Sequence, residues 1–180
     1  MLNNIGEIYY AEEDYEKGLP LFEEAFSLYE KVDDKGKMAT TLVDIGKYHD
    51  HNEQFERANQ VYGQALQLVQ ENDANAFFPY IYHGIALHYQ SKDDHQQAII
   101  YGEKALIEMK DQQNDAYQIP NYELLHESYA ARGNYQRAYE IRDDQMEFLD
   151  STNNIALKTK VEALQTQFAV EQKESENKLL

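Results

Sequence analysis

Apolar and polar positions along this chain recur at an interval of 40 residues. Ile5, Ile45 and Ile85 occupy the same position in successive copies, and Leu125 takes it in a fourth. Within each copy, apolar residues return at three- and four-residue spacing over two segments, which a short polar cluster separates. The pattern predicts two amphipathic helices per copy. Such pairs must stack on one another, because a single pair cannot bury its apolar face.

Small and aromatic residues alternate at fixed positions of the repeat. Small residues stand where two helices must approach closely, and aromatic residues fill the space on the facing helix. The first copy has Gly6, Tyr9, Gly18, Phe22 and Ala25, the second has Gly46, His49, Ala58, Tyr62 and Ala65, and the third has Ala86, Tyr89, Ala98, Gly102 and Ala105. The fourth copy has Arg142 and Gln145 where an aromatic and a small residue are expected, which predicts a more solvated second helix.

This order of residues resembles the tetratricopeptide repeat over residues 1–150. The resemblance implies an all-α fold: a right-handed α–α superhelix of four helix pairs plus a C-terminal capping helix, nine helices in all. The interval of 40 residues exceeds the usual 34, so each helix should be about one turn longer.

Polar clusters at a constant phase set the expected boundaries of the repeats at 1–33, 34–73, 74–113 and 114–150. Asp14 and Asp34 are predicted to cap the helices that follow them. Pro20 should kink its helix or delay its start, because proline removes a backbone hydrogen bond. The first helix of copy one would begin before Met1, so we interpret Met1 as a start inside a longer protein, which leaves a signal sequence or earlier repeats open.

The composition changes near Asp150. Residues 151–180 carry four Lys and four Glu, so the net charge of −17 lies in the repeats. Leu157, Val161, Leu164 and Phe168 form an apolar seam that predicts a capping helix over 153–168. Residues 164–168 and 171–180 resemble the linker that follows repeat sensor regions in bacterial signalling proteins such as diguanylate cyclases and histidine kinases, and that resemblance implies an output domain beyond the tail. The remainder, 169–180, should have nothing to pack on within this chain, so it either projects into solvent or pairs with the same segment of a second chain in a homodimer.

Charge and composition exclude several classes of function. With 33 acidic and 16 basic residues, the chain cannot neutralise many phosphates, which argues against nucleic acid and anionic membranes as partners. The acidity either serves solubility or steers a basic or mixed-charge peptide. No run of about 18 apolar residues predicts a membrane span. The absence of cysteine excludes disulfides and thiolate chemistry.

Candidate catalytic and metal-binding constellations are poor. His49 and His51 are two residues apart, and His83 and His88 are five apart, neither of which suits a helical metal pair. The carboxylate-x-x-His spacing of Glu123 and His126 occurs once, whereas di-iron bundles need two copies and further Glu. We therefore expect no enzyme activity, no metal and no cofactor, and we interpret His49 and His95 as core or helix-interface residues.

The resemblance implies that the first helix of each repeat lines a concave groove. Projecting the groove-facing stripe gives the ligand-binding candidates Asn3, Glu7, Tyr10, Val43, Lys47, Asp50, Tyr80, His83, Leu87, Gln90, Glu123 and Glu127. Relatives that grip an acidic C-terminal tail present Lys, Asn and Arg here. Asn3 and Lys47 match that clamp, but Glu123 and Glu127 oppose it. A groove that binds no ligand stays an alternative.

The sequence thus predicts a regulatory module of a larger signalling protein, either a sensor or a scaffold. A protein or peptide segment would bind in the groove, and the C-terminal helix would carry the output. The alternative is a structural scaffold that associates with itself and has no groove ligand. We expect the cytoplasm as its location, or the periplasm if the full chain has a signal sequence and a membrane span.

Overall fold

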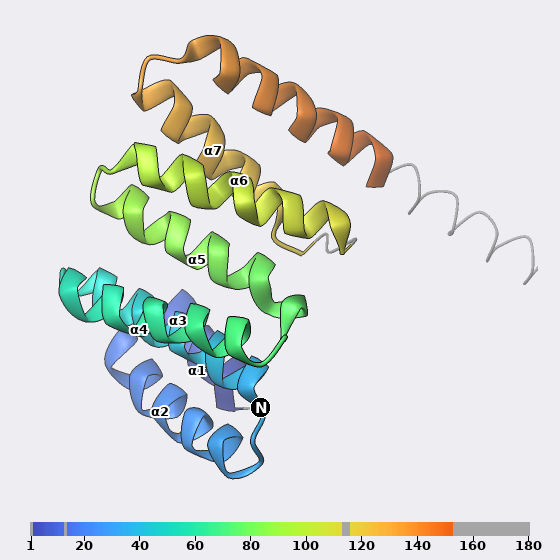
Figure 1. Cartoon of the computed structure of the whole chain (residues 1–180). Helices are drawn as coiled ribbons and strands as arrows, with labels where there is room; N and C mark the ends of the chain where they lie inside the picture. Colours follow the sequence, from blue (N-terminus) through green and yellow to red (C-terminus); the bar gives the residue numbers. More distant parts are fainter. Residues whose placement is uncertain (1, 13, 113–115, 153–180) are drawn as a thin grey trace, which may run out of the picture. The chain divides into compact units, whose positions relative to one another are not determined.

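The computed structural model of the chain describes residues 2–12, 14–112 and 116–152 (Figure 1). Within these ranges the chain is helical and contains no strand, which confirms the all-α fold. The chain divides into two compact units, Met1–Ile141 and Arg142–Leu180, and each is a body by itself.

The helices follow one another with short connections. They are α1 (Leu2–Ala11), α2 (Tyr15–Lys31), α3 (Lys35–His51), α4 (Phe55–Glu71), the 3₁₀ turn η1 (Asn75–Phe77), α5 (Phe78–Ser91), α6 (His95–Asp111) and α7 (Gln118–Ala131). A further helical segment runs over 135–152. The predicted capping helix over 153–168 and the linker over 169–180 lie outside the described residues, so the count of nine helices and the handedness stay predictions.

In the first unit, consecutive helices pack in pairs. α1 contacts α2, α3 contacts α4, and α5 contacts α6 (Figure 1). Successive pairs are joined by contacts of α2 with α3 and of α4 with α5. The first helices also touch directly, α3 with α5 and α5 with α7. Side chains on neighbouring first helices can therefore meet.

The alternation of small and aromatic residues has a direct steric cause. Ala58 and Ala65 are 0% exposed in the core, next to Tyr62 at 2%. A Cβ atom added at Gly46 would lie 2.6 Å from Cζ of Tyr62, and one added at Gly6 would lie 2.6 Å from Cε1 of Phe22. In the first two repeats, the aromatic ring of the second helix packs directly against the glycine of the first helix.

The turns repeat more closely than the sequence pattern indicates. Residues with positive φ end successive helices at Asp33 (57°), Glu53 (55°), Asp73 (52°), Asp93 (57°) and Gly133 (75°). In each case the next residue donates its backbone N–H to a carbonyl five residues back, as Asp34 does to Tyr29 at 3.0 Å and Asp94 does to Tyr89 at 2.9 Å. This bond belongs to the Schellman arrangement that ends helices with a left-handed residue.

The predicted caps have different outcomes. Asp34 caps α3, since its Oδ1 accepts from the backbone N–H of Lys37 at 3.0 Å. Asp14 precedes α2 without a side-chain capping bond; its Oδ2 instead pairs with Nζ of Lys17 at 2.5 Å. The expected late start of α2 at Pro20 is wrong, because α2 already begins at Tyr15.

Among the described residues, no helix combines the length and the apolar character that crossing a membrane requires.

Candidate functional site

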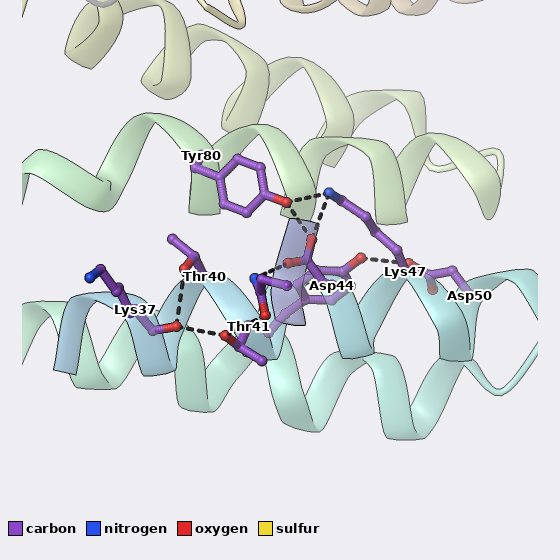
Figure 2. A network of polar contacts seen from close by, with 9 residues as sticks. Lys37, Thr40, Thr41, Asp44, Lys47, Asp50 and Tyr80 are labelled. Carbon is purple, nitrogen blue, oxygen red and sulfur yellow. Dashed lines mark hydrogen bonds and ion pairs between the residues drawn. The ribbon is translucent and has the colours of Figure 1, made fainter. Parts of the chain in front are cut away.

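The first helices bury a carboxylate, Asp44, in the apolar run Leu42–Ile45 of α3, where it is only 2% exposed. Its oxygens accept from Nδ2 of Asn3 on α1 at 3.0 Å and from Nζ of Lys47 at 3.1 Å. The hydroxyl of Tyr80 on α5 also donates to Asp44 and contacts Nζ of Lys47 at 2.6 Å (Figure 2). Three helices therefore meet at one carboxylate.

The surroundings explain why this charge is tolerated in the interior. A buried carboxylate is stable only when it is paired and its lone pairs are hydrogen-bonded. Lys47 supplies the opposite charge, and its ammonium lies 4.5 Å from the centre of the Tyr80 ring. Thr41 supports Asn3 by donating to its Oδ1 at 3.1 Å. The ammonium of Lys47 and the amide of Asn3 are thus engaged by an internal carboxylate.

A cavity of about 320 Å³ opens beside this network. It is lined by Asn3, Thr40, Asp44, Ala76, Phe77, Tyr80 and Tyr117. We call it the Asp44 cavity. Its wall is aromatic on one side, because the rings of Tyr80 and Tyr117 lie 5.0 Å apart.

A larger cavity, of about 550 Å³, lies further along the same helices. It is lined by Tyr10, Lys47, Asp50, His51, Tyr62, Leu87, Gln90 and Ser91. We call it the Asp50 cavity. One oxygen of Asp50 lies 2.5 Å from Nδ1 of His88, and the other accepts from the hydroxyl of Tyr62 at 2.9 Å. Since a carboxylate can only accept, His88 donates through Nδ1.

The two carboxylates make this region electronegative. Burial raises the pKa of Tyr10 to about 12, with further contributions from Tyr15, Asp50 and Asp44. Burial likewise raises the pKa of Tyr62 well above its ordinary value, and the charge of Asp50 adds to the effect. Both phenols stay protonated at neutral pH and can donate hydrogen bonds.

A third polar contact joins α5 to α7 in the interior. His83 is 5% exposed, and its Nδ1 lies 3.1 Å from Oδ1 of Asn121. The amide nitrogen of Asn121 donates to the carbonyl of Gly102 at 2.8 Å. Burial lowers the pKa of His83 to about 4, so the ring is neutral at physiological pH.

The structure brings seven of the twelve predicted groove residues to the two cavities. Tyr10, Lys47, Asp50, Leu87 and Gln90 line the Asp50 cavity, whereas Asn3 and Tyr80 line the Asp44 cavity. Glu123 and Glu127 are exposed on α7, where Glu127 accepts from Gln90 at 3.1 Å. The side chain of Glu7 lies outside the described residues.

Two of the predicted groove residues are corrected. Val43 is 0% exposed within the core cluster, and His83 is buried against Asn121, so neither faces the groove. The projection assumed that each first helix shows one whole side to solvent. In the structure α3 and α5 contact helices on several sides, which leaves a narrower open stripe.

Sequence reasoning missed Asp44, His51, Tyr62 and His88. A charged or polar residue inside an apolar stretch, as in Leu42-Val43-Asp44-Ile45 or Ile85-Ala86-Leu87-His88, could have indicated a buried polar contact. Its partner could not be found in this way, since His88 lies 38 residues from Asp50 along the chain. Within the part of the chain that the structure describes, no group of three or more His, Asp or Glu could hold a metal ion.

Comparison with known proteins agrees with this geometry. Residues 1–71 match the family described as tetratricopeptide repeat. The crystal structure of BtubC (BKLC) from P. vanneervenii is similar, with a TM-score of 0.70 and 21% sequence identity over 84% of this chain. The chain spans 63% of the length of that structure. No curated protein matches the chain.

The chain is a tetratricopeptide-like helical repeat protein. Repeats of this class generally mediate protein–protein interaction or scaffolding, and they are generally non-catalytic.

Proposed function

We propose that this protein is a regulatory interaction module that binds a segment of a partner protein along its first helices. The observation that carries the proposal is the pair of cavities, of about 550 and 320 Å³, along α1, α3 and α5. Both combine aromatic walls with hydrogen-bonding groups, which is the usual make-up of a binding pocket. The net charge of −17 favours a segment of basic or mixed charge.

Within a larger protein, the module would act as the sensor or scaffold part of a signalling protein, without catalytic activity of its own. Partner binding would be transmitted to residues 151–180 and from there to an output domain. We propose the cytoplasm as its location, with the periplasm as the alternative. Hydrogen exchange of residues 151–180 with and without a bound peptide tests the transmission, and unchanged exchange would contradict it.

The binding face itself can be tested with peptides selected from a displayed random library on the wild-type protein. Leu87 lines the Asp50 cavity, so the larger side chain of Leu87→Trp should fill it. The matched control is Leu68→Trp, which fills a cavity of about 480 Å³ lined also by Phe26 and Met38. We expect the selected peptides to lose at least about tenfold in affinity on Leu87→Trp and to bind Leu68→Trp as they bind the wild type. Equal affinity for both variants would refute binding along the first helices.

A second candidate function, self-association without a groove ligand, is favoured by one surface of the first unit. Tyr135 and Tyr139 lie one helical turn apart and are 73% and 68% exposed. Large exposed aromatic side chains that share a face are typical of contact surfaces. Sedimentation of the full chain over a range of concentrations tests this candidate. A dimer that Tyr139→Ser abolishes would support it, and a monomer at every concentration would exclude it.

A further inference from the structure

The Asp50 cavity has a carboxylate with unused acceptor capacity. A carboxylate offers about four acceptor positions, and the ring of His88 and the hydroxyl of Tyr62 occupy two of those of Asp50. The side chain of Asp50 is 12% exposed and reaches the cavity, while His88 behind it is 1% exposed. These two buried donors fix the orientation of the carboxylate, so a donor from a ligand would meet a preorganised acceptor.

Flat rings form part of the lining of the cavity. The rings of Tyr15 and His51 stack with centroids 3.5 Å apart, and Tyr10 meets Tyr15 edge-on at 4.8 Å. His51 and Tyr10 both line the cavity. Because each of these rings packs against another, their positions are fixed before a ligand binds.

The charges around the cavity favour a cation. Among the described residues that line it, Lys47 carries an ammonium group, and this group is directed to Asp44 and Tyr80 on the neighbouring part of α3 and α5 (Figure 2). Lys47 is therefore paired with Asp44, whereas the partners of Asp50 are the ring of His88 and the hydroxyl of Tyr62, which leave its negative charge in place as long as His88 is neutral. Burial is the main cause of the raised pKa of Tyr10, and the nearby charges of Asp50 and Asp44 add to it.

We propose that the Asp50 cavity binds the guanidinium group of an arginine side chain from the partner segment. Asp50 would accept its N–H groups, and the ring wall of Tyr10 and His51 would cover its flat face. This inference rests on the proposed function, since it names the chemistry of the segment that the first helices bind.

Arginine fits the cavity better than lysine for three reasons. Guanidinium presents a planar fork of donors that suits a carboxylate, whereas an ammonium is a point charge. It stacks on aromatic faces, which the wall provides. Guanidinium is also less strongly hydrated than an ammonium, so it gives up less hydration free energy when it enters a partly enclosed site.

The same residues disfavour an acidic ligand. Asn3 and Lys47, which would have to bind a carboxylate, already donate to Asp44. An incoming carboxylate would have to displace an internal one that is 2% exposed. A segment that ends in an acidic tail is therefore a poor occupant of this face.

The inference can be tested without knowing the partner. Acetyl-arginine methylamide is titrated into the isotope-labelled protein, and amide shifts at Tyr10 and Leu87 are followed by nuclear magnetic resonance. The neutral analogue acetyl-citrulline methylamide, which keeps the shape but lacks the charge, is titrated in parallel. We expect saturable shifts with the arginine probe and at least about tenfold weaker binding of the citrulline probe.

Two variants with the same added charge locate the site. Ser91→Lys places an ammonium in the lining of the Asp50 cavity without removing a partner of Asp50. It should lower the affinity for the arginine probe several-fold, because the two positive charges repel each other. Gln64→Lys adds the same charge at the cavity beside α4, away from Asp50, and should leave the affinity unchanged. Asp50→Asn should abolish binding of the arginine probe. If that variant does not fold, the comparison of Ser91→Lys with Gln64→Lys still tests the site.

Equal binding of the arginine and citrulline probes, or equal effects of the two lysine variants, would overturn the inference. If the selected peptides no longer bind Leu87→Trp, but replacing their arginine residues does not weaken binding to the wild type, the proposed function stands and the arginine site is wrong. If the arginine probe binds as expected while no peptide depends on Leu87, the site stands and the proposed function fails.

Discussion

The first helices α3, α5 and α7 bury several polar side chains, whereas, in the part of the chain that the structure describes, the second helices α2, α4 and α6 do not; the helical segment over 135–152 buries one, Gln145, at 4% exposure. Among the described residues, α3, α5 and α7 bury Thr41, Asp44, His83, His88, Gln118, Asn121 and Ser128. The buried residues of α2, α4 and α6 are alanine, glycine, aromatic or aliphatic, such as Ala58, Tyr62 and Ala65 on α4.

The difference reflects two kinds of contact. A second helix packs its small and aromatic residues against the first helix of its own repeat, as Tyr62 does against Gly46. Neighbouring first helices also pack through apolar atoms, as Gly84 does against Val43, but they are tied in addition by directional bonds: Asn3 to Asp44, His88 to Asp50, and His83 to Asn121. Apolar packing holds each pair together and contributes between pairs, and the polar ties help to fix how one pair is aligned with the next.

The largest effect should come from removing the carboxylate at which three helices meet. Asp44→Ala leaves Lys47 and Asn3 without their acceptor, and should lower the free energy of unfolding by about 2–4 kcal/mol. Urea denaturation measures the loss. Glu24→Ala, at an exposed position of α2, should change the midpoint little. Similar midpoints for the two variants would mean that the polar ties are incidental.

The polar tie between α5 and α7 should make stability depend on pH. The folded-state pKa of His83 is about 4, below the value of about 6.5 of an unfolded chain. Between these values the unfolded state binds a proton that the folded state excludes, so stability falls as pH drops from about 6.5 towards 4, by up to about 3 kcal/mol. Above this window the contribution of His83 is constant.

His83→Gln provides the reference for that measurement, since its amide can still donate to Asn121 while it does not titrate. We expect the wild type to lose more stability than His83→Gln when both are unfolded in urea at neutral and acidic pH. The same loss in both proteins would show that His83 is accessible to protons in the folded state.

The apolar contacts of the second helices should respond to volume. Ala98 on α6 is 0% exposed, and Ala98→Leu should destabilise the protein by ~1–3 kcal/mol through overpacking. Ala131 lies exposed at the end of α7, so Ala131→Leu adds the same atoms without a clash. The midpoints of thermal unfolding distinguish them, and a neutral Ala98→Leu would indicate that the repeat core is loosely packed.

The smallest effect should be a gain in stability. Gly63 lies inside α4 with no atom within 4 Å of an added Cβ, so Gly63→Ala should stabilise the protein by about 0.5–1 kcal/mol through helix propensity. The same substitution at Gly46 should destabilise it, because that Cβ would lie 2.6 Å from the ring of Tyr62. Urea midpoints that shift in the same direction for both variants would contradict the packing of small residues against rings.

Much of the candidate site could be located from the sequence, because the helical period puts Tyr10, Lys47 and Asp50 on one stripe of their helices. The errors, Val43 and His83, come from the width of that stripe, which depends on how many neighbours each first helix has. The pairing of Asn3 and Lys47 with Asp44 could not be predicted either. The helical period tells which face of its helix a residue occupies, but it does not tell which residue of another helix that side chain contacts.

By itself the sequence determined the repeat, the all-α fold and the small-to-aromatic packing within the first two pairs. These follow from local periodicity, because a helix of 3.6 residues per turn converts spacing directly into faces. Only the tertiary structure decided which polar residues are buried and what they bind. The bonds of Asp44 to Asn3 and of Asp50 to His88 span 41 and 38 residues, and their geometry exists only once neighbouring repeats have stacked. The chemistry of the two cavities depends on those bonds.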